Sequence, residues 1–430
     1  MRKHPARSAF RGRLAPALIG LALLALAVPA GAAASAPSVL TFKTMQVGMP
    51  GNPAVGIVPF TDAIYPECAA APQPEKPQDP SCMMVGAVGY GYGIGQLEVT
   101  VGQWVKFLNT VDPLGRDRHG LYSETESGDA WPRFGQLNYS AGARPGRHYS
   151  PAAPEWVDKP YGFADFKRSA RFVNSLYNGK LLAKRKGTEG PYSYVSYRVR
   201  LSRQTERGMY DLRRPRTTRT AKTGFVVPSQ NEWIKSAYYD PSGGGTYSYW
   251  KYPTNPGAFG DENKSAPKQA TLDAKGNVLN ASSSQPLAIF HTPKTEPPTW
   301  CPSNQTAQDC ATVNPFGFSI EKYEAAYAGS LGTVGQAETR GPWGTLDQGG
   351  NVVEWTDTIT PPPFGKKGPR VWRRLHGGIA NAPVYQLWLS AVGLQPQENT
   401  FFTATYPSLG IRVGVVGDLK IGKGGPTGKR

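Results

Sequence analysis

The chain has 430 residues, including 50 glycines and 40 prolines, while charged residues make up 18% and aromatic residues 11%. This composition excludes a helical bundle and disfavours a disordered chain, because the many aromatic side chains supply large buried areas. The formal net charge of +17 indicates acidic surface polymers, anionic lipid or solubility more than nucleic acid, since no nucleic-acid motif accompanies the basic residues.

The first segment, residues 1–36, has the order of a secretory signal peptide. A basic start precedes an apolar run from Ala15 to Val28, and small residues follow, with residues 30–32 and 34–36 as candidate cleavage sites. An uncleaved anchor is the alternative, although this apolar run is short for a membrane span of about 20 residues. We therefore expect a protein that is secreted, periplasmic or at the cell surface.

Residues 37–84 are predicted to be a Pro-rich, irregular N-terminal extension, and four cysteines bear on the surrounding loops. An even cysteine count in an oxidising compartment predicts disulfides. Three pairings are possible, and closeness in sequence favours Cys68 with Cys82 and Cys301 with Cys310.

Several regular elements are expected between residues 85 and 240. Alternating large side chains predict a strand over residues 90–94. Capping signals and helical spacing predict a helix after Thr100 that runs to Val111, and a second helix over 161–177, stopped by Asn-Gly. A capping box at 229–232 begins a third helix.

Residues 193–222 are strongly basic and are predicted to be partly an insertion, and the tail over 416–430 is also basic. A solvated surface segment is the ordinary interpretation of such a run. Contact with an anionic surface polymer is the alternative. A further loop insertion is predicted at about 255–327.

The segment 341–357, GPWGTLDQGGNVVEWTD, is a candidate calcium loop. Its carboxylate and carbonyl oxygens fall within eight residues, and its glycines allow a tight turn. The proposed ligands are Asp347, Gly350, Val352 and Glu354. The alternative is an ordinary buried strand with solvated acids.

Together these segments resemble the sulfatase-modifying-factor family, which includes the formylglycine-generating enzyme. The resemblance spans about residues 85–415 and rests on blocks that occur in the family's order: EVT and FLN, RFVNSLYNGK, PSQNEW, YSYWKYPT, GNVVEW and the terminal GIR. It implies an irregular, loop-rich α+β domain with a C-type-lectin-like fold. The chain is then predicted to consist of a signal peptide (1–36), the extension (37–84), the family-like domain (85–415) and the tail (416–430).

The resemblance also shows which chemistry this chain lacks. Family enzymes oxidise a cysteine in a sulfatase peptide with copper held by two thiolates, and the corresponding positions here are Ala382 and Leu387. Neither side chain binds copper. We therefore expect no copper and name no catalytic residue. Iron-dependent relatives need a set of histidines, and no H-x-x-x-H spacing occurs in the mature chain.

A calcium-stabilised binding module is the resulting expectation, with a protein, peptide or glycan as its unknown partner. The predicted ligand-binding residues are His376, Asn381, Tyr385 and Trp388, because rigid aromatics beside polar groups make good contact surfaces. The alternative for His376 is that its imidazole hydrogen-bonds loop backbone. The alternative function is an oxidoreductase of the formylglycine-generating or non-heme iron type, with an unrecognised site in the same groove.

Overall fold

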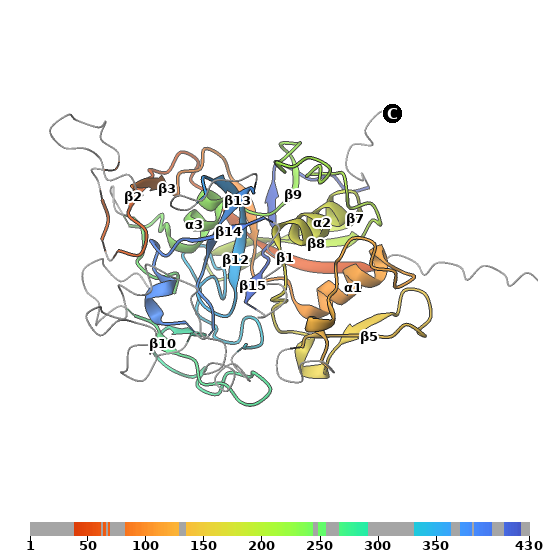
Figure 1. Cartoon of the computed structure of the whole chain (residues 1–430). Helices are drawn as coiled ribbons and strands as arrows, with labels where there is room; N and C mark the ends of the chain where they lie inside the picture. Colours follow the sequence, from red (N-terminus) through yellow and green to blue (C-terminus); the bar gives the residue numbers. More distant parts are fainter. Residues whose placement is uncertain are drawn as a thin grey trace, which may run out of the picture. The chain divides into compact units, whose positions relative to one another are not determined.

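The computed structural model describes residues 38–61, 63–65, 68, 82–128, 135–243, 248–254, 266–290, 331–362, 370–380, 382–397 and 408–422. They form a mixed α+β structure, as predicted, in which strands predominate (Figure 1). The α-helices of this part of the chain are α1 (Val101–Val111), α2 (Phe166–Tyr177) and α3 (Gln230–Tyr238). The predicted signal peptide, Cys301, Cys310 and Asn381 lie outside the described residues.

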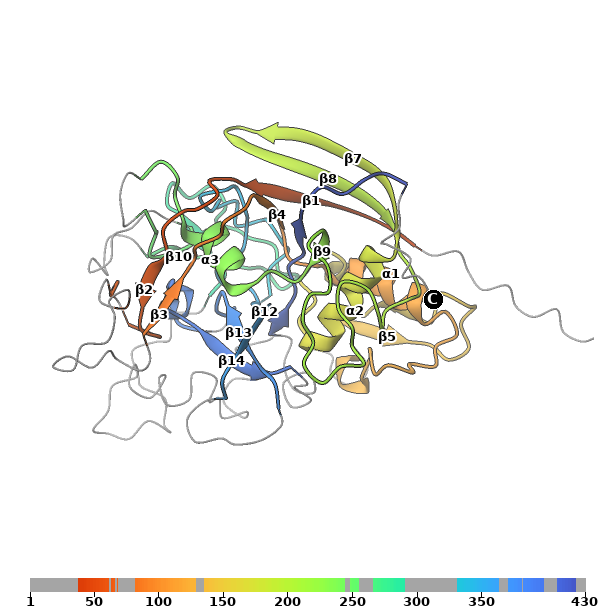
Figure 2. The ribbon, with the colours of Figure 1, turned by 90° about the horizontal axis from the view of Figure 1, so that it is seen from above.

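The larger sheet has six strands, all antiparallel to their neighbours, in the order β7-β8-β1-β4-β16-β9 (Figure 2). Long strands lie at one side of this sheet and short strands at the other. In sheet order they are β7 (Lys180–Glu189), β8 (Tyr192–Arg200), β1 (Val39–Val47), β4 (Tyr92–Gly95), β16 (Gly414–Val416) and β9 (Gly224–Val226).

A four-stranded sheet contains the end of the candidate calcium loop. Its order is β14 (Gly393–Pro396), β13 (Trp372–His376), β12 (Val353–Thr360) and β15 (Leu409–Gly410), and β15 is parallel to β12. Smaller pairs are β2 (Val55–Ile57) with β3 (Met83–Val85), β5 (Leu137–Tyr139) with β6 (Tyr149–Pro151), and β10 (Lys268–Gln269) with β11 (Leu287–Ala288). Short 3-10 helices are η2 (Glu124–Glu126), η3 (Pro154–Trp156) and η4 (Val384–Leu387).

The prediction that residues 37–84 are irregular was wrong for Val39–Val47. This segment is β1, which pairs with β8 on one side and β4 on the other. Its nine residues contain no proline, and Leu40, Thr44, Met45 and Val47 are buried. In the same region the predicted disulfide between Cys68 and Cys82 is confirmed.

The helices confirm the capping signals, with one displaced start. Thr100 and Ser229 each form a complete capping box at the start of α1 and α3. The second helix was predicted from residue 161 but begins after its N-cap Asp165. Residues 161–164 are instead extended, because Phe163 bridges to Leu409 and its backbone neighbours bond that strand.

Aromatic side chains join α1, α2 and β12 in the main core. The Trp104 ring stacks on Tyr161 with centroids 4.1 Å apart, and Phe172 of α2 packs on the same indole. Trp355 of β12 donates its indole N–H to the Ala164 carbonyl at 2.7 Å. The Trp-rich segment of the candidate loop is therefore part of the core. None of the helices in the described part of the chain is long and apolar enough to cross a membrane.

Glu189 fixes the tip of the β7–β8 hairpin. Its carboxylate pairs with Lys43 of β1, accepts from Gln96 Nε2 at 2.7 Å and lies 3.1 Å from Arg340 Nη1. The hydrogen bond from Lys43 is the main reason that the pKa of Glu189 falls to about 2. The carboxylate is thus ionised in the folded state at acidities where an unfolded chain would protonate it.

Replacing Glu189 by glutamine is expected to cost about 1 kcal/mol at pH 7, a modest value because partly exposed pairs are screened by solvent. Since the folded pKa is lowered, the contribution is present above the ordinary value of 4.5 and disappears as pH falls from there to about 2. Urea unfolding of both proteins between pH 2 and 7 measures this difference. A difference that stays constant across this window would contradict the assignment.

Candidate functional site

The candidate calcium loop is held in a backbone shape that requires glycine at one position. Asp347 and Asn351 have positive φ angles of 53° and 59°, and Gly350 has 89°. A Cβ atom at Gly350 would lie 2.1 Å from the Ile289 carbonyl oxygen. The loop is therefore packed against Ile289 and closed on that side.

Glu354, the predicted acidic ligand on β12, forms a buried ion pair. Both of its carboxylate oxygens accept from Arg412 Nε, at 2.9 and 3.0 Å, and Oε1 also accepts from Nη2 at 2.7 Å. Trp233 of α3 donates its indole N–H to Oε2 at 2.6 Å. This carboxylate thus binds donors of the protein on both oxygens.

Arg412 uses its remaining N–H groups on backbone carbonyls. It donates to Gly95 and Gln96 at 2.9 Å and to Leu346 at 3.0 Å, and its side chain is wholly buried. This single guanidinium joins β4, the calcium-loop segment and the segment after β15. The arginine of the terminal GIR block therefore has a structural role, because it holds these three segments together.

Two more buried carboxylates lie around the same guanidinium. Glu98 Oε2 is 3.8 Å from Arg412 Nη2, and neither Glu98 oxygen has a hydrogen-bond partner among the described residues. Asp347 accepts from the Gly335 N–H. Burial raises the pKa of Glu98 well above its ordinary range and that of Asp347 to about 6, while Arg412 opposes both shifts. Three acids thus share one fixed positive charge.

Calcium fits this donor set only in part. Carboxylates and loop carbonyls are the oxygen ligands that calcium prefers, and the acids outnumber the positive charge. However, the described residues contain no group of three His, Cys, Asp or Glu side chains that could hold a metal ion. Ligation by Asp347, Gly350, Val352 and Glu354 stays a prediction, and it would depend largely on backbone carbonyls.

His376, predicted to bind ligand, is buried at the end of β13. Its ring stacks on Trp233 with centroids 5.2 Å apart. Burial, and then the Arg374 charge, lowers its pKa to about 3, although the Ala391 backbone opposes this shift. Neither ring nitrogen has a described partner in hydrogen-bonding geometry. The imidazole is therefore neutral and shielded from solvent in this conformation.

The predicted ligand-binding residues Tyr385 and Trp388 lie in and directly after the 3-10 helix η4. Trp388 is 5% exposed, and its indole N–H donates to the Tyr252 hydroxyl at 2.9 Å. Lys251 Nζ lies 4.9 Å from the Trp388 ring centroid, a cation–π contact. Tyr385 packs on the same indole and is only partly buried. The Trp388 ring is thus part of an apolar cluster, and its role as a ligand-binding residue stays a prediction.

The two positions that the family resemblance would assign to the copper thiolates are part of the packed interior. Ala382 is 1% exposed and belongs to the main core, while Leu387 is fully buried beside Tyr252 and Phe290. No free cysteine occurs among the described residues. The side chains at these positions therefore contribute apolar packing.

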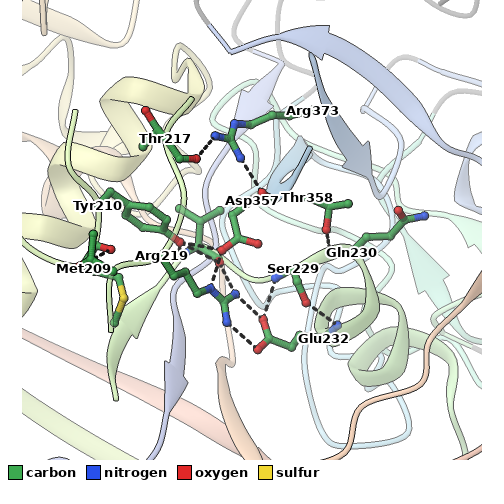
Figure 3. Close-up of polar contacts among 12 residues, drawn as sticks. Met209, Tyr210, Thr217, Arg219, Ser229, Gln230, Glu232, Asp357, Thr358 and Arg373 are labelled. Atoms are coloured by element: carbon green, nitrogen blue, oxygen red, sulfur yellow. Dashed lines mark hydrogen bonds and ion pairs between the residues drawn. The ribbon is translucent and has the colours of Figure 1, made fainter. Parts of the chain in front are cut away.

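A second polar cluster, which the sequence did not reveal, centres on Arg219 (Figure 3). Its guanidinium binds Glu232 through two parallel bonds, at 2.9 Å from Nη1 to Oε1 and 2.6 Å from Nη2 to Oε2. Its Nε donates to Asp357 at the end of the loop segment. Two acids from α3 and β12 thus converge on one arginine from the basic stretch.

Tyrosines complete this cluster, and each donates to one carboxylate. The Tyr210 hydroxyl donates to Asp357 at 2.9 Å, and the Tyr90 hydroxyl donates to Glu232 at 2.6 Å. Burial raises the pKa of Glu232, but bonds from Arg219 outweigh it and lower the value overall. Burial raises the pKa of Asp357, with Arg219 opposing. Neither carboxylate is left as an open base.

A cavity of about 740 Å³ opens over this cluster. It is lined by the residues just before β4, those just before β9 and those at the end of β16. The lining includes Tyr90, Arg219, Lys222 and Gly417. Tyr90 is 46% exposed, while its hydroxyl is held by a hydrogen bond to Glu232. The cavity therefore offers an aromatic ring and cationic side chains on a wall that the ion pairs hold rigid.

Sequence patterns could identify only one member of this cluster. Glu232 was predicted as a helix cap, and it does cap α3 by accepting from the Ser229 N–H at 2.7 Å. Arg219 was one of many arginines in the basic run, with no spacing that distinguished it. Its two partners are 13 and 138 residues away, so no local signal predicts the contact.

Comparison with known proteins leaves the family open. No protein-family model and no curated protein sequence matches the chain. Among solved structures, it is similar to Treponema denticola variable protein 1 (13% identity, TM-score 0.38), CarF (13%, 0.40) and PvdO from Pseudomonas aeruginosa (12%, 0.35). Each similarity covers 89% of this chain and 100% of the other. At these TM-scores we draw no conclusion from them.

Proposed function

We propose that this chain is an exported, formylglycine-generating-enzyme-like protein that acts as a binding module and lacks the copper oxidase activity. The C-type-lectin-like fold is part of the same proposal. The observation that carries it is the pair of buried apolar side chains, Ala382 and Leu387, at the positions of the copper thiolates. A soft cuprous ion needs sulfur ligands at close range, and these side chains supply none.

The cavity beside Tyr90 supports a binding role over a reaction. Its volume of about 740 Å³ falls within the range of about 300–1,000 Å³ that is usual for small-molecule sites. The acids next to it are engaged by Arg219 and two tyrosine hydroxyls. Such a wall can orient a ligand without supplying a free general base.

An assay of peptide oxidation tests this proposal. Reduced, copper-loaded protein is incubated with a cysteine-containing sulfatase peptide, and mass spectrometry follows conversion to the aldehyde. We expect no conversion by the wild type. The matched variant carries Ala382→Cys with Leu387→Cys and is expected to bind cuprous ion where the wild type does not. Aldehyde formation by the wild type would refute the proposal.

Calcium binding is a separate prediction. Protein purified in calcium is expected to hold one or two equivalents of calcium and no copper or iron, as measured by mass spectrometry. Chelation is expected to lower the melting temperature, because a bound ion stabilises only the folded state. Asp347→Asn is the matched variant, since it preserves shape and removes one predicted charged ligand. Full calcium retention in this variant would remove Asp347 from the ligand set.

A further inference from the structure

The solvent side of β7, β8 and β1 carries exposed cations and no acid in three consecutive rows. Directly opposed residues of antiparallel strands lie on one face, and the alternate residues of β8, such as Val199, are buried. We call this surface the basic face. Its rows are Lys180, Arg200 and Val39; Ala183, Arg198 and Thr41; and Arg185, Ser196 and Lys43.

The exposed cations of the basic face are not neutralised by the described residues. Lys180, Arg185, Arg198 and Arg200 form no ion pair with them, and Glu189, at the end of β7, pairs with Lys43 and Arg340. Lys180 stands directly opposite Arg200. Like charges in that position destabilise a strand pair. An anionic partner would therefore reduce the repulsion between these two cations.

Protection of a sheet edge accounts for only part of this charge. β7 is the edge strand, and lysines on edge strands prevent pairing with other chains. Arg198 and Arg200 belong to β8, which β7 and β1 flank on both sides (Figure 2). Edge protection does not require arginines there.

We propose that the basic face binds a linear polysaccharide that carries carboxylate or sulfate groups. This inference rests on the binding role proposed above and names the class of partner. Neighbouring cations are about 7 Å apart along a strand and about 5 Å apart between strands. A regularly charged, extended chain matches such a grid. Arginine adds planar donors that bind oxyanions through two hydrogen bonds.

Other polyanions fit the basic face less well. Its nine positions include no aromatic side chain, and single-stranded nucleic acids are bound by stacking on aromatics. Three strands with their side chains are too wide for a DNA major groove of about 12 Å. Insertion into a membrane requires exposed apolar side chains, whereas the largest apolar residue here, Val39, is half-buried.

Binding of the full chain to immobilised heparin, a sulfated polysaccharide, and to alginate, a carboxylated one, tests the inference. At low salt we expect wild-type binding to at least one of them. The double variant Arg198→Ser with Arg200→Ser is expected to bind at least about tenfold more weakly. The slope of its log affinity against log salt concentration is expected to be smaller by about two. Arg198→Lys with Arg200→Lys keeps the charge and is expected to retain most of the affinity.

The matched control is Arg213→Ser with Arg214→Ser. These exposed arginines pair with Asp211 and are not among the nine positions of the basic face, and their loss changes the net charge equally. Equal weakening in both double serine variants would overturn the position of the site. Stronger wild-type binding to a DNA duplex or phosphatidylserine vesicles would overturn the partner class. Absence of wild-type binding to both polysaccharides would overturn the inference, while the copper assay decides the proposed function independently.

Discussion

Replacing Arg219 by alanine is expected to lower the free energy of unfolding by about 3–5 kcal/mol, the usual cost of removing one partner from a buried ion pair. Its guanidinium is the one cation that hydrogen-bonds both Glu232 and Asp357 through side-chain atoms in the described network. Without it, both carboxylates would be buried with only tyrosine and backbone donors. Urea unfolding followed by tryptophan fluorescence at pH 7 measures the loss.

Two variants separate the loss of the Arg219 ion pairs from a loss of side-chain packing. Lys222→Ala changes an exposed neighbour on the rim of the cavity and is expected to stay within about 0.5 kcal/mol of the wild type. Adding Glu232→Gln and Asp357→Asn to Arg219→Ala removes the uncompensated charges and is expected to recover about half of the loss. A loss below about 1 kcal/mol in Arg219→Ala would contradict a central role for the ion pairs.

The elements that the sequence predicted are those with local signals. Thr100 and Ser229 specify helix starts through contacts within four residues, and both starts are confirmed. The start of α2 was misplaced because Phe163 pairs with Leu409, a contact between distant segments. β1 was missed for the same reason, since Thr44 pairs with Val195, 151 residues later.

In the candidate site, too, the sequence predicted the residues that have local signals and missed their partners from distant segments. The loop segment at Asp347–Glu354 stood out through glycines and acids in one short run, but its arginine partner comes from residue 412. Hydrophobic patterning could not tell whether Trp388 faces solvent, because Tyr252, 136 residues away, decides that by accepting its indole N–H. Pairings of this kind depend on the tertiary fold, so the contacts of Arg219 with Glu232 and Asp357 could not be predicted from the sequence.

Glutamine substitution is expected to cost far more stability at Glu354 than at Glu98, although both carboxylates are buried beside Arg412. Glu354→Gln should cost about 3–5 kcal/mol, because it removes the partner of a buried arginine. In chelator, Glu98→Gln should change stability by less than about 1 kcal/mol. The Glu98 oxygens have no hydrogen-bond partner among the described residues, and its charge repels Asp347 and Glu354. Chemical denaturation of both variants at pH 7 measures the difference.

The same pair of variants tests how the excess negative charge is neutralised. Three carboxylates face one guanidinium, so the folded protein either retains protons there or binds a cation. If protons neutralise it, Glu98→Gln mimics the protonated acid, and stability is equal in calcium and in chelator. If a cation neutralises it, Glu98→Gln costs as much as Glu354→Gln in calcium, and chelator removes the cost of Glu98→Gln but not that of Glu354→Gln. Unfolding in both buffers therefore decides whether the cluster around Arg412 holds protons or a metal ion.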